Sequence, residues 1–314
     1  MKQRRLGKSG LQVSVVGLGC NNFAWRTDLA ASRRVIDRAI DCGITLFDTA
    51  DVYGNFGGSE EHIGQCLGER RNGLVLATKF SVPMDPSIKR KDASRRYIMT
   101  AVEASLRRLK THWIDLYQLH RPDDSTPIEE TLRALDDLVR QGKVRYIGCS
   151  NLPAWQVVDA RWTSIHLGLG AFVSCQDEYN VLARGPEREL IPAMRACGIG
   201  MLPYYPLASG LLSGKYRRDA PLPPDGRITN GQRYIDQHLT DSNWRKVDRL
   251  REFCAQRGHS LLELAFSWLA AQPVMASIIA GATRPEQVEQ NARAADWALG
   301  AEDLAEIDRL TLAE

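Results

Sequence analysis

The sequence predicts a (β/α)8 barrel built by one domain that spans residues 1–314. Short apolar runs typical of buried strands alternate eight times with segments of helical periodicity, and no break in composition divides the chain. The same alternation would also build an open, doubly wound parallel sheet. Eight units, together with the lack of a glycine-rich dinucleotide-binding turn, favour the barrel.

The predicted strands follow a short hairpin that turns at Gly7–Gly10 and is placed to close the floor of the barrel. They are residues 15–19, 44–48, 74–79, 114–119, 144–149, 172–176, 200–205 and 275–281. A barrel takes roughly 250 residues. The remainder fits the hairpin, a Gly/Pro-rich segment at about 208–240 that could cover the top, and a C-terminal helix near 302–311.

The helices between the strands carry the apolar stripe that packs a helix against a sheet. The clearest stripes are Val35, Ile36, Ala39 and Ile40; Ile98, Val102, Leu106 and Leu109; and Ile128, Leu132, Leu135 and Val139. Gly43 and Gly142 predict the ends of the first and last of these helices. Thr126, Pro127 and Glu129 predict a capping box at the start of the last one.

Composition excludes several classes of protein. The net charge of +3 is small and the basic residues are scattered, which argues against a nucleic-acid partner. No apolar run approaches the ~18 residues of a membrane span, and MKQRRLGKSG has no apolar run behind it, so neither a membrane partner nor a secretory signal is expected. Seven dispersed cysteines without a C-x-x-C pair indicate buried thiols in a reducing cytoplasm.

Four residues suited to proton transfer fall at or near the ends of predicted strands. Strand 44–48 ends on Asp48, and Tyr53 follows five residues later; strand 74–79 ends on Lys79, and His120 follows the next strand. In a parallel β/α protein, active sites are built where the strands end. Each residue alone has a plain structural explanation, such as an aspartate that caps a turn. Their joint placement predicts a proton-transfer site.

Six stretches occur in order along the chain: FDTADVYGNFGGSEEHIGQCL, LATKF, IDLYQLHRPD, GKVRYIGCSN, PLASGLLSGKY and GATRPEQVEQN. Together they resemble the aldo-keto reductase family nearly from end to end. FGGSEEHIG resembles the bacterial reductases that are similar to voltage-gated potassium-channel β subunits. The resemblance implies reversible NADPH-dependent reduction of a small aldehyde or ketone, with hydride from the nicotinamide and a proton from Tyr53. An NADP(H)-binding redox sensor or regulator with weak catalysis is the alternative.

The four residues then have complementary roles. A phenol has a pKa of about 10, so Tyr53 needs tuning to act near neutral pH. A protonated Lys79 nearby would lower the pKa of Tyr53, and Asp48 would hold Lys79 in place and charged. By resemblance, His120 donates a hydrogen bond to the substrate carbonyl and orients it.

Two common phosphate-binding motifs fail. Gly17 and Gly19 lack the third glycine of a Rossmann turn, and residues 210–216 have one residue too few and Tyr216 where a P-loop needs Ser or Thr. The resemblance instead implies an NADPH/NADP site from loops and strand ends. Its residues are Ser150, Asn151, Gln176, Tyr204, Pro206, Leu207, Ser209, Gly210, Leu211, Gly214, Lys215, Gly281, Thr283, Arg284, Gln287, Gln290 and Asn291.

The resemblance implies contacts with successive parts of the cofactor, from the nicotinamide to the pyrophosphate. Ser150, Asn151 and Gln176 would bond the nicotinamide carboxamide. By resemblance, Tyr204 stands where the family places an aromatic ring that stacks on the nicotinamide. Tyr204 and Tyr205 would face opposite ways in a strand, so only one can stack. Small residues between 206 and 215 would let backbone amides approach the pyrophosphate.

By resemblance, the start of the helix that follows the eighth predicted strand is expected to bind the adenosine 2′-phosphate, which would favour NADPH over NADH. Thr283 and Glu286 are spaced as a capping box, and Arg284 offers a planar fork for a phosphate. Gln290 stands where the family usually has a glutamate, so its contact with adenine would be uncharged.

The substrate pocket is expected to be walled by Asn22, Phe23, Trp25 and Phe80, and an aromatic wall suits a hydrophobic carbonyl compound. Arginines at 217, 218 and 227 could attract an anionic substrate, although solvation is favoured. Six histidines without H-x-H or H-E-x-x-H spacing predict no metal site. The pattern carries no signal for the natural substrate, the direction of reaction or the oligomeric state.

Overall fold

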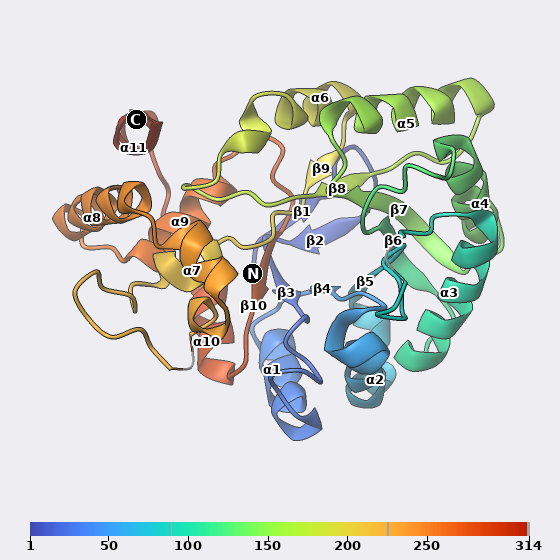
Figure 1. Ribbon diagram of the computed structural model, residues 1–314, viewed down its shortest axis with the longest axis horizontal. Helices are drawn as coiled ribbons and strands as arrows, with labels where there is room; N and C mark the ends of the chain where they lie inside the picture. The colour runs from blue at the N-terminus through green and yellow to red at the C-terminus, as the bar shows by residue number, and fades with distance from the viewer. Residues whose placement is uncertain (89, 225, 313–314) are drawn as a thin grey trace.

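The computed structural model describes residues 1–88, 90–224 and 226–312. Its main sheet has eight parallel strands in the order β10-β3-β4-β5-β6-β7-β8-β9. A parallel bridge from Met201 to Met275, and a hydrogen bond from the Ile279 N–H to the Pro203 carbonyl (3.0 Å), join the two ends of that order. The predicted (β/α)8 barrel is therefore confirmed (Figure 1).

The strands are short and end at one edge of the sheet. They are β3 (Val16–Gly19), β4 (Leu46–Asp48), β5 (Val75–Phe80), β6 (Ile114–Leu119), β7 (Val144–Ser150), β8 (Ser174–Gln176), β9 (Gly200–Met201) and β10 (Ile278–Gly281). The seventh predicted strand, 200–205, is shorter than expected. Tyr205 has a φ of +53°, which strand geometry does not allow, so the chain leaves the sheet before the two tyrosines.

Helices cover the outside of the barrel. They are α1 (Leu29–Asp41), α2 (Tyr53–Leu67), α3 (Arg95–Leu109), α4 (Ile128–Arg140), α5 (Ala154–Leu167), α6 (Leu190–Cys197), α7 (Gln232–His238), α8 (Asp241–Gln256), α9 (Leu261–Ala270), α10 (Pro285–Arg293) and α11 (Ala301–Leu312). In Figure 1, α1 to α6 follow the strands around one side and α7 to α11 gather on the other. The expected helix near 302–311 is α11. Segment 208–240 contains α7 and short 3-10 turns, and residue 225 within it lies outside the described part.

Residues two apart on a strand both point into the barrel, and they lie in two different environments along its axis. Leu46 and Ala77 belong to a small apolar cluster within the barrel, and two residues further along the same strands stand Asp48 and Lys79. The interior is therefore apolar toward the start of the strands and polar where they end. The cluster is Leu6, Val13, Leu46, Val75, Ala77, Leu116, Leu202, Ala276 and Ile279.

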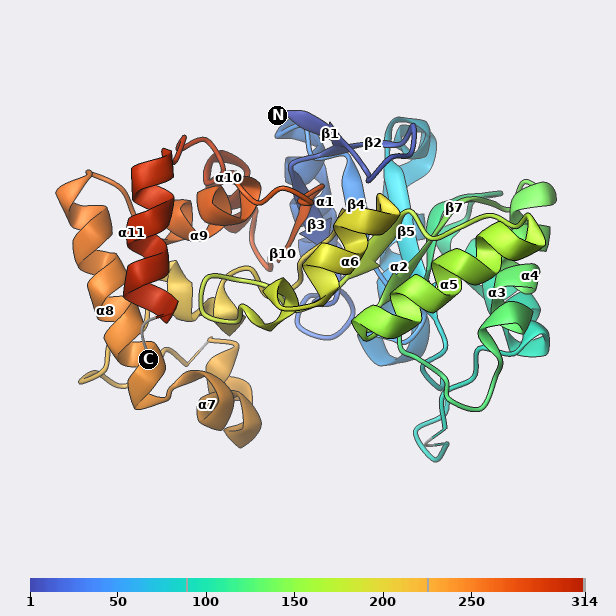
Figure 2. The ribbon, with the colours of Figure 1, turned by 90° about the horizontal axis from the view of Figure 1, so that it is seen from above.

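The predicted N-terminal hairpin is formed by β1 (Gln3–Arg5) and β2 (Gln12–Ser14) and lies across one end of the strands (Figure 2). Leu6 and Val13 are fully buried in the cluster inside the barrel. Gly7 has a φ of +60°, and a Cβ there would lie 2.6 Å from the Gly198 carbonyl oxygen. Only glycine allows the two backbones to come this close. The hairpin therefore lies tightly against the barrel and closes its floor.

Helix starts differ from prediction at two places. Pro127, not Thr126, is the N-cap of α4, and the Thr126 hydroxyl donates to Asp123 Oδ2 (2.6 Å) instead of capping the helix. Similarly, Pro285 occupies the first turn of α10, so the N-cap falls on Arg284. Both predicted capping boxes are therefore absent, because a proline one or two residues after the threonine moves the start of the helix past it.

A complete capping box does occur at the start of α9. The Ser260 hydroxyl accepts from the Glu263 N–H (3.2 Å), and Glu263 Oε2 accepts from the Ser260 N–H (2.8 Å). The S-x-x-E spacing of this pair is visible in the sequence.

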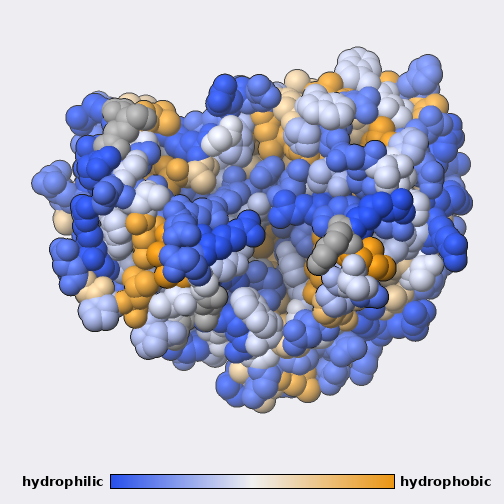
Figure 3. All heavy atoms as spheres, viewed as in Figure 1, coloured by the Kyte–Doolittle hydropathy of each residue, from blue (hydrophilic) through white to orange (hydrophobic). Residues whose placement is uncertain are grey.

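Hydrophilic residues predominate on the face shown in Figure 3, where apolar residues form separate small areas. None of the helices in the described ranges has the length and apolar character needed to cross a bilayer.

Candidate active site

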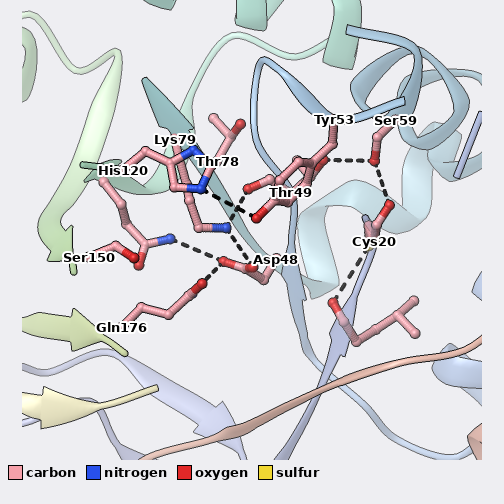
Figure 4. A network of polar contacts seen from close by, with 12 residues as sticks. Cys20, Asp48, Thr49, Tyr53, Ser59, Thr78, Lys79, His120, Ser150 and Gln176 are labelled. Carbon is pink, nitrogen blue, oxygen red and sulfur yellow. Dashed lines mark hydrogen bonds and ion pairs between the residues drawn. The ribbon is translucent and has the colours of Figure 1, made fainter. Parts of the chain in front are cut away.

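The four residues expected to transfer protons come together at the carboxyl ends of the strands (Figure 4). Lys79 Nζ donates to Asp48 Oδ2 (2.6 Å) and to the Thr49 carbonyl (2.8 Å), and both Lys79 and Asp48 are buried. Lys79 Nζ also lies 5.0 Å from the centre of the Tyr53 ring. Tyr53 Oη is 3.4 Å from His120 Nε2.

Asp48 has two further partners, which leave its carboxylate fully occupied. Its Oδ1 accepts from Gln118 Nε2 (3.1 Å) and from Gln176 Nε2 (2.9 Å). Gln118 was not predicted as a site residue. The signal was its place on β6, two residues after the interior Leu116 and two before His120, which turns its side chain toward the barrel axis.

The charge on Lys79 is held by its neighbours. Burial alone would lower the pKa of the Lys79 ammonium, but Asp48 and Tyr53 outweigh that effect, so the pKa of Lys79 is raised above its ordinary value. A buried cation that is hydrogen-bonded to a carboxylate stays charged across the physiological range.

The phenol of Tyr53 departs from expectation. Burial raises the pKa of Tyr53 above its ordinary value, and Asp48 adds to the rise while Lys79 opposes it. The predicted lowering by Lys79 is present but smaller than the effect of burial. Tyr53 is therefore a neutral phenol at neutral pH, a state that can donate a proton and cannot accept one.

His120 is neutral for a similar reason. Burial and the positive charges of Lys79, Arg121 and Lys91 hold the pKa of His120 well below 6.5. Its Nδ1 has no hydrogen-bond partner among the described residues, whereas Nε2 points at Tyr53 Oη. With its proton on Nε2, the imidazole can donate to an oxygen placed beside the phenol.

A strained turn presents Tyr53. The residues that follow it, Gly54, Asn55, Phe56 and Gly57, all have positive φ (67°, 59°, 66° and 119°). A Cβ on Gly54 would lie 2.4 Å from the Phe23 carbonyl oxygen, so the turn packs directly against the loop after β3. Left-handed backbone costs about 1–2 kcal/mol for a residue with a side chain, and such strain concentrates at functional sites.

A cavity of ≈ 560 Å³ opens beside these residues. Asp48 and Tyr53 lie on its wall. Predicted cofactor residues that line it are Gln176, Tyr204, Pro206, Leu207, Ser209, Gly210, Lys215, Gly281, Thr283, Arg284, Gln287, Gln290 and Asn291. Other lining residues are Gly19, Cys20, Asn21, Asn22, Arg26, Tyr205, Ser213, Arg227, Ser260, Leu262, Ile279 and Ala280.

Four predicted cofactor residues do not line the cavity. Leu211 is fully buried in the core, and Gly214 has a left-handed φ of +82° at the end of its turn. Ser150 and Asn151 bond to each other (2.7 Å), and the Asn151 amide also donates to the His120 carbonyl (3.1 Å).

Tyr204 and Tyr205 both face the cavity, contrary to the expectation that only one could. Their rings meet edge to face with centroids 5.1 Å apart. The expectation assumed a strand, but the left-handed Tyr205 turns its ring to the same side. Tyr204 Oη donates to Asn151 Oδ1 (2.8 Å), which fixes the orientation of its ring.

The expected aromatic pocket wall is only partly present. Asn22 lines the cavity and Trp25 is 54% exposed, but Phe23 and Phe80 are fully buried in the core. The Phe80 ring packs 4.7 Å from that of Tyr117. Strand alternation explains its burial, because the pleat that turns Lys79 inward turns the next residue outward.

Arg227 is a cavity residue rather than a solvated one. Its Nη2 donates to Asn21 Oδ1 (3.2 Å) and Asn22 Oδ1 (3.1 Å), and its guanidinium lies 5.4 Å from the centre of the Tyr205 ring. Its hydrogen-bond partners lie 206 and 205 residues away in the sequence, so no local pattern indicated this position. Among the described lining residues the cations are Arg26, Lys215, Arg227 and Arg284.

The start of α10 forms the far end of the cavity. Thr283 donates through its backbone N–H (2.8 Å) and its hydroxyl (3.3 Å) to Gln287 Oε1. Gln287, Gln290 and Asn291 thus present amide groups beside Arg284. No group of three or more His, Cys, Asp or Glu side chains in the described ranges is arranged to hold a metal ion.

Comparison with known proteins identifies the family. The model of the aldo/keto reductase family matches residues 15–311. The chain belongs to the aldo/keto reductase family. The stretches that carry the resemblance are therefore those of a true aldo/keto reductase, and its barrel and hairpin follow that fold.

Curated relatives of this aldo/keto reductase cover nearly the whole chain. A probable voltage-gated potassium channel subunit beta from Arabidopsis thaliana is 38% identical, over 94% of this chain and 92% of the relative. The L-glyceraldehyde 3-phosphate reductase of Escherichia coli strain K12 is 33% identical, over 98% and 92%. The versiconal hemiacetal acetate reductase of Aspergillus parasiticus is 34% identical, over 87% and 86%.

Proposed function

We propose that this aldo/keto reductase reduces small aldehydes or ketones to alcohols with NADPH, in a reversible reaction. The observation that carries the proposal is the position of Tyr53: a neutral phenol within 3.4 Å of a neutral imidazole, on the wall of a cavity that also carries four cations. Relatives named as reductases of a phosphorylated aldehyde and of a hemiacetal acetate support the reaction class.

The cavity suits a nicotinamide dinucleotide. Such a cofactor carries several phosphate charges, and Arg26, Lys215, Arg227 and Arg284 supply positive charge along the wall. Tyr204, Gln176 and Tyr53 all line this cavity. When bound, the cofactor supplies the hydride.

The residues of the chain supply the rest. His120 Nε2 and Tyr53 Oη can both donate to one carbonyl oxygen, which orients the substrate and polarises it. As negative charge grows on that oxygen, Tyr53 gives up its proton. Lys79 then stabilises the phenolate, and Asp48 keeps Lys79 charged. In the reverse direction, the phenolate takes the proton from an alcohol.

Selectivity for NADPH is proposed to reside at the start of α10. The 2′-phosphate distinguishes NADPH from NADH, and a guanidinium bonds a phosphate through two parallel N–H groups. Arg284, as the N-cap residue of α10, stands where the backbone N–H groups of a helix also favour an anion. Gln290 and Asn291 are proposed to face the adenine.

The experiment that tests the function follows oxidation of NADPH by its absorbance, with a panel of short, aromatic, sugar and dicarbonyl aldehydes. Parallel reactions use NADH, and NADP with alcohols. Turnover with NADPH preferred is the expected result. Tight NADPH binding without turnover on any substrate would refute the enzyme and favour the alternative, a nucleotide-sensing regulator, a class suggested by the relatives named as potassium channel subunits.

The cellular setting is proposed to be the cytoplasm. All seven cysteines are free thiols, as a reducing compartment requires, and Cys20, Cys66, Cys149, Cys175 and Cys254 are buried.

A further inference from the structure

A buried carboxyl group lies beneath the turn that carries Tyr53. Asp51 is 1% exposed, and its backbone N–H donates to the carbonyl of Lys79 (3.2 Å). Its Oδ1 has no hydrogen-bond partner among the residues that the structure describes. Asp51 thus stands between two residues of the proton-transfer group without touching the cavity.

The number of available protons restricts the hydrogen bonds that Asp51 and Tyr97 can form. Tyr97 Oη lies 3.4 Å from Asp51 Oδ2 and 3.3 Å from the carbonyl oxygen of Val82. A phenol has one proton, and a backbone carbonyl can only accept. If the Tyr97 proton goes to Val82, the contact with Asp51 needs a proton on Asp51. One consistent chain therefore runs from the carboxylic O–H of Asp51 to Tyr97 and on to Val82.

The charged groups near Asp51 favour its protonated, neutral form. From α2, Glu60 faces it, with its two oxygens occupied by Thr78 (2.5 Å) and by Arg108 of α3 (2.7 Å). Burial and Glu60 raise the pKa of Asp51 to about 8, against the opposing effects of the Arg108 charge, the Val52 N–H and the Tyr97 hydroxyl. From β5, Lys79 is engaged by Asp48.

The remaining neighbours are phenols. Burial raises the pKa of Tyr97 on α3 and of Tyr117 on β6 above their ordinary values, and Asp51 adds to both shifts. Tyr117 Oη, like Asp51 Oδ1, has no hydrogen-bond partner among the described residues. The surroundings of Asp51 therefore hold two neutral phenols and two cations that are each paired with a carboxylate, Lys79 with Asp48 and Arg108 with Glu60. These surroundings favour a neutral acid.

We propose that Asp51 is a positioning residue that works as a neutral carboxylic acid, whose bond to Tyr97 fixes the turn presenting Tyr53. The bond ties three segments together: the turn after β4, helix α3, and the residues that follow Lys79. On ionisation, the Asp51 carboxylate accepts the single Tyr97 proton, and the bond from Tyr97 to the Val82 carbonyl is lost. The turn then loosens and Tyr53 loses its alignment with His120. The effect on catalysis rests on the proposed function.

The kinetic test compares pH profiles of NADPH-dependent carbonyl reduction between pH 6 and 10. At pH 9, one unit above a pKa of about 8, only about a tenth of the molecules keep the neutral acid, so kcat of the parent enzyme should fall about tenfold while KM changes little. Asp51→Asn should restore a flat profile, because its amide N–H₂ replaces the O–H donor. Asp51→Ala should lose activity at every pH. Asp124→Asn, at an exposed position, should keep the parent profile.

Two outcomes would overturn the proposal: an unchanged alkaline fall in Asp51→Asn, or parent-like activity in Asp51→Ala. A second measurement needs no turnover. Infrared spectra of the parent protein at pH 6 should contain the carbonyl band of a buried, protonated carboxylic acid, and this band should vanish at pH 10. Its absence at pH 6 would refute the neutral acid. If the parent reduces no carbonyl compound, the proposed function fails while this measurement still decides the state of Asp51.

The pH dependence of thermal stability tests the same protonation state of Asp51. A carboxyl whose pKa is raised in the folded state stabilises the fold below its unfolded pKa, and that stability is lost as pH rises toward about 8. Asp51→Asn does not titrate. Its Tm relative to that of the parent should therefore increase between pH 5 and pH 8, and a constant difference would contradict the assignment.

Discussion

The ammonium of Lys79 binds the carboxylate of Asp48 at 2.6 Å and at the same time lies 5.0 Å from the centre of the Tyr53 ring. One buried cation thus lies beside a permanent partner and beside a phenol that we propose becomes an anion only during the reaction. Asp48 balances the charge of Lys79 in the resting enzyme, and the phenolate of Tyr53 would share it in the transition state.

Removing either member of the buried pair should destabilise the fold strongly. Lys79→Met leaves the Asp48 carboxylate without its cation, and breaking a buried ion pair costs about 3–5 kcal/mol. The double variant with Asp48→Asn should cost less than the sum of the two single changes, because it buries no lone charge. Unfolding in urea measures each free energy, and strictly additive values would contradict the coupling.

Tyr53→Phe should lower kcat by at least ~100-fold, the scale of general acid catalysis. Binding of NADPH should stay within a few-fold of the parent, because the phenol is needed only for the proton. Steady-state kinetics and NADPH fluorescence measure the two quantities. Turnover like that of the parent would exclude Tyr53 as the proton donor.

Arg284 and Arg227 should affect the two nucleotides differently. Arg284→Ala should weaken NADPH binding by about tenfold to a hundredfold, the value of a hydrogen bond to a charged group, and leave NADH binding unchanged. Arg227→Ala should weaken both, because both nucleotides carry the pyrophosphate. Arg217→Ala, at an exposed position outside the cavity, is the control. Equal losses for both nucleotides in Arg284→Ala would place the 2′-phosphate elsewhere.

Histidine titration should make the fold sensitive to acid. Because the pKa of His120 is held well below 6.5, the unfolded chain binds more protons than the native protein below that pH, and stability falls as pH falls. His120→Asn should therefore lose less stability than the parent between pH 7 and pH 5. Denaturant titrations at both pH values test this, with exposed His112→Asn as the control. An equal loss in His120→Asn and the parent would contradict a buried neutral imidazole.

The end of α3 offers a gain in stability. Lys110 follows this helix with a φ of +51°, whereas Gly142 ends α4 in the same conformation with a φ of +73°. Lys110→Gly should stabilise the protein by about 1 kcal/mol, and Gly142→Ala should destabilise it by a similar amount. A Cβ on Gly142 would meet no atom within 4 Å, so Gly142→Ala measures the backbone strain without a new side-chain contact. A loss of stability in Lys110→Gly would show that its side chain contributes more than the strain costs.

Local periodicity was sufficient to predict the barrel. The apolar runs and helical stripes gave the order of the elements, and the ends of β4, β5 and β6 gave the positions of Asp48, Lys79 and His120. Each of these signals lies within a short window of sequence, which is why it could be read without the structure.

Features that depend on distant partners were missed. Gln118 was not predicted as a site residue, and its acceptor, Asp48, lies 70 residues away. Solvation was favoured for Arg227 because its hydrogen-bond partners, Asn21 and Asn22, are remote in sequence. The direction of the Tyr53 pKa shift depends on how deeply the whole barrel buries the phenol, and no local pattern carries that quantity.

The contact between Gly7 and the stretch around Gly200 has a consequence for synthesis. Leu6 packs against Gly200, and the Lys8 N–H bonds the Gly198 carbonyl, so the packing of the hairpin is completed by residues made about two hundred positions later. During translation, the hairpin is made before its partners, and the apolar side chain of Leu6 stays exposed until they follow. The floor of the barrel is therefore a late step in maturation, and a chain stalled before residue 200 would emerge as an open sheet with nothing to seal it.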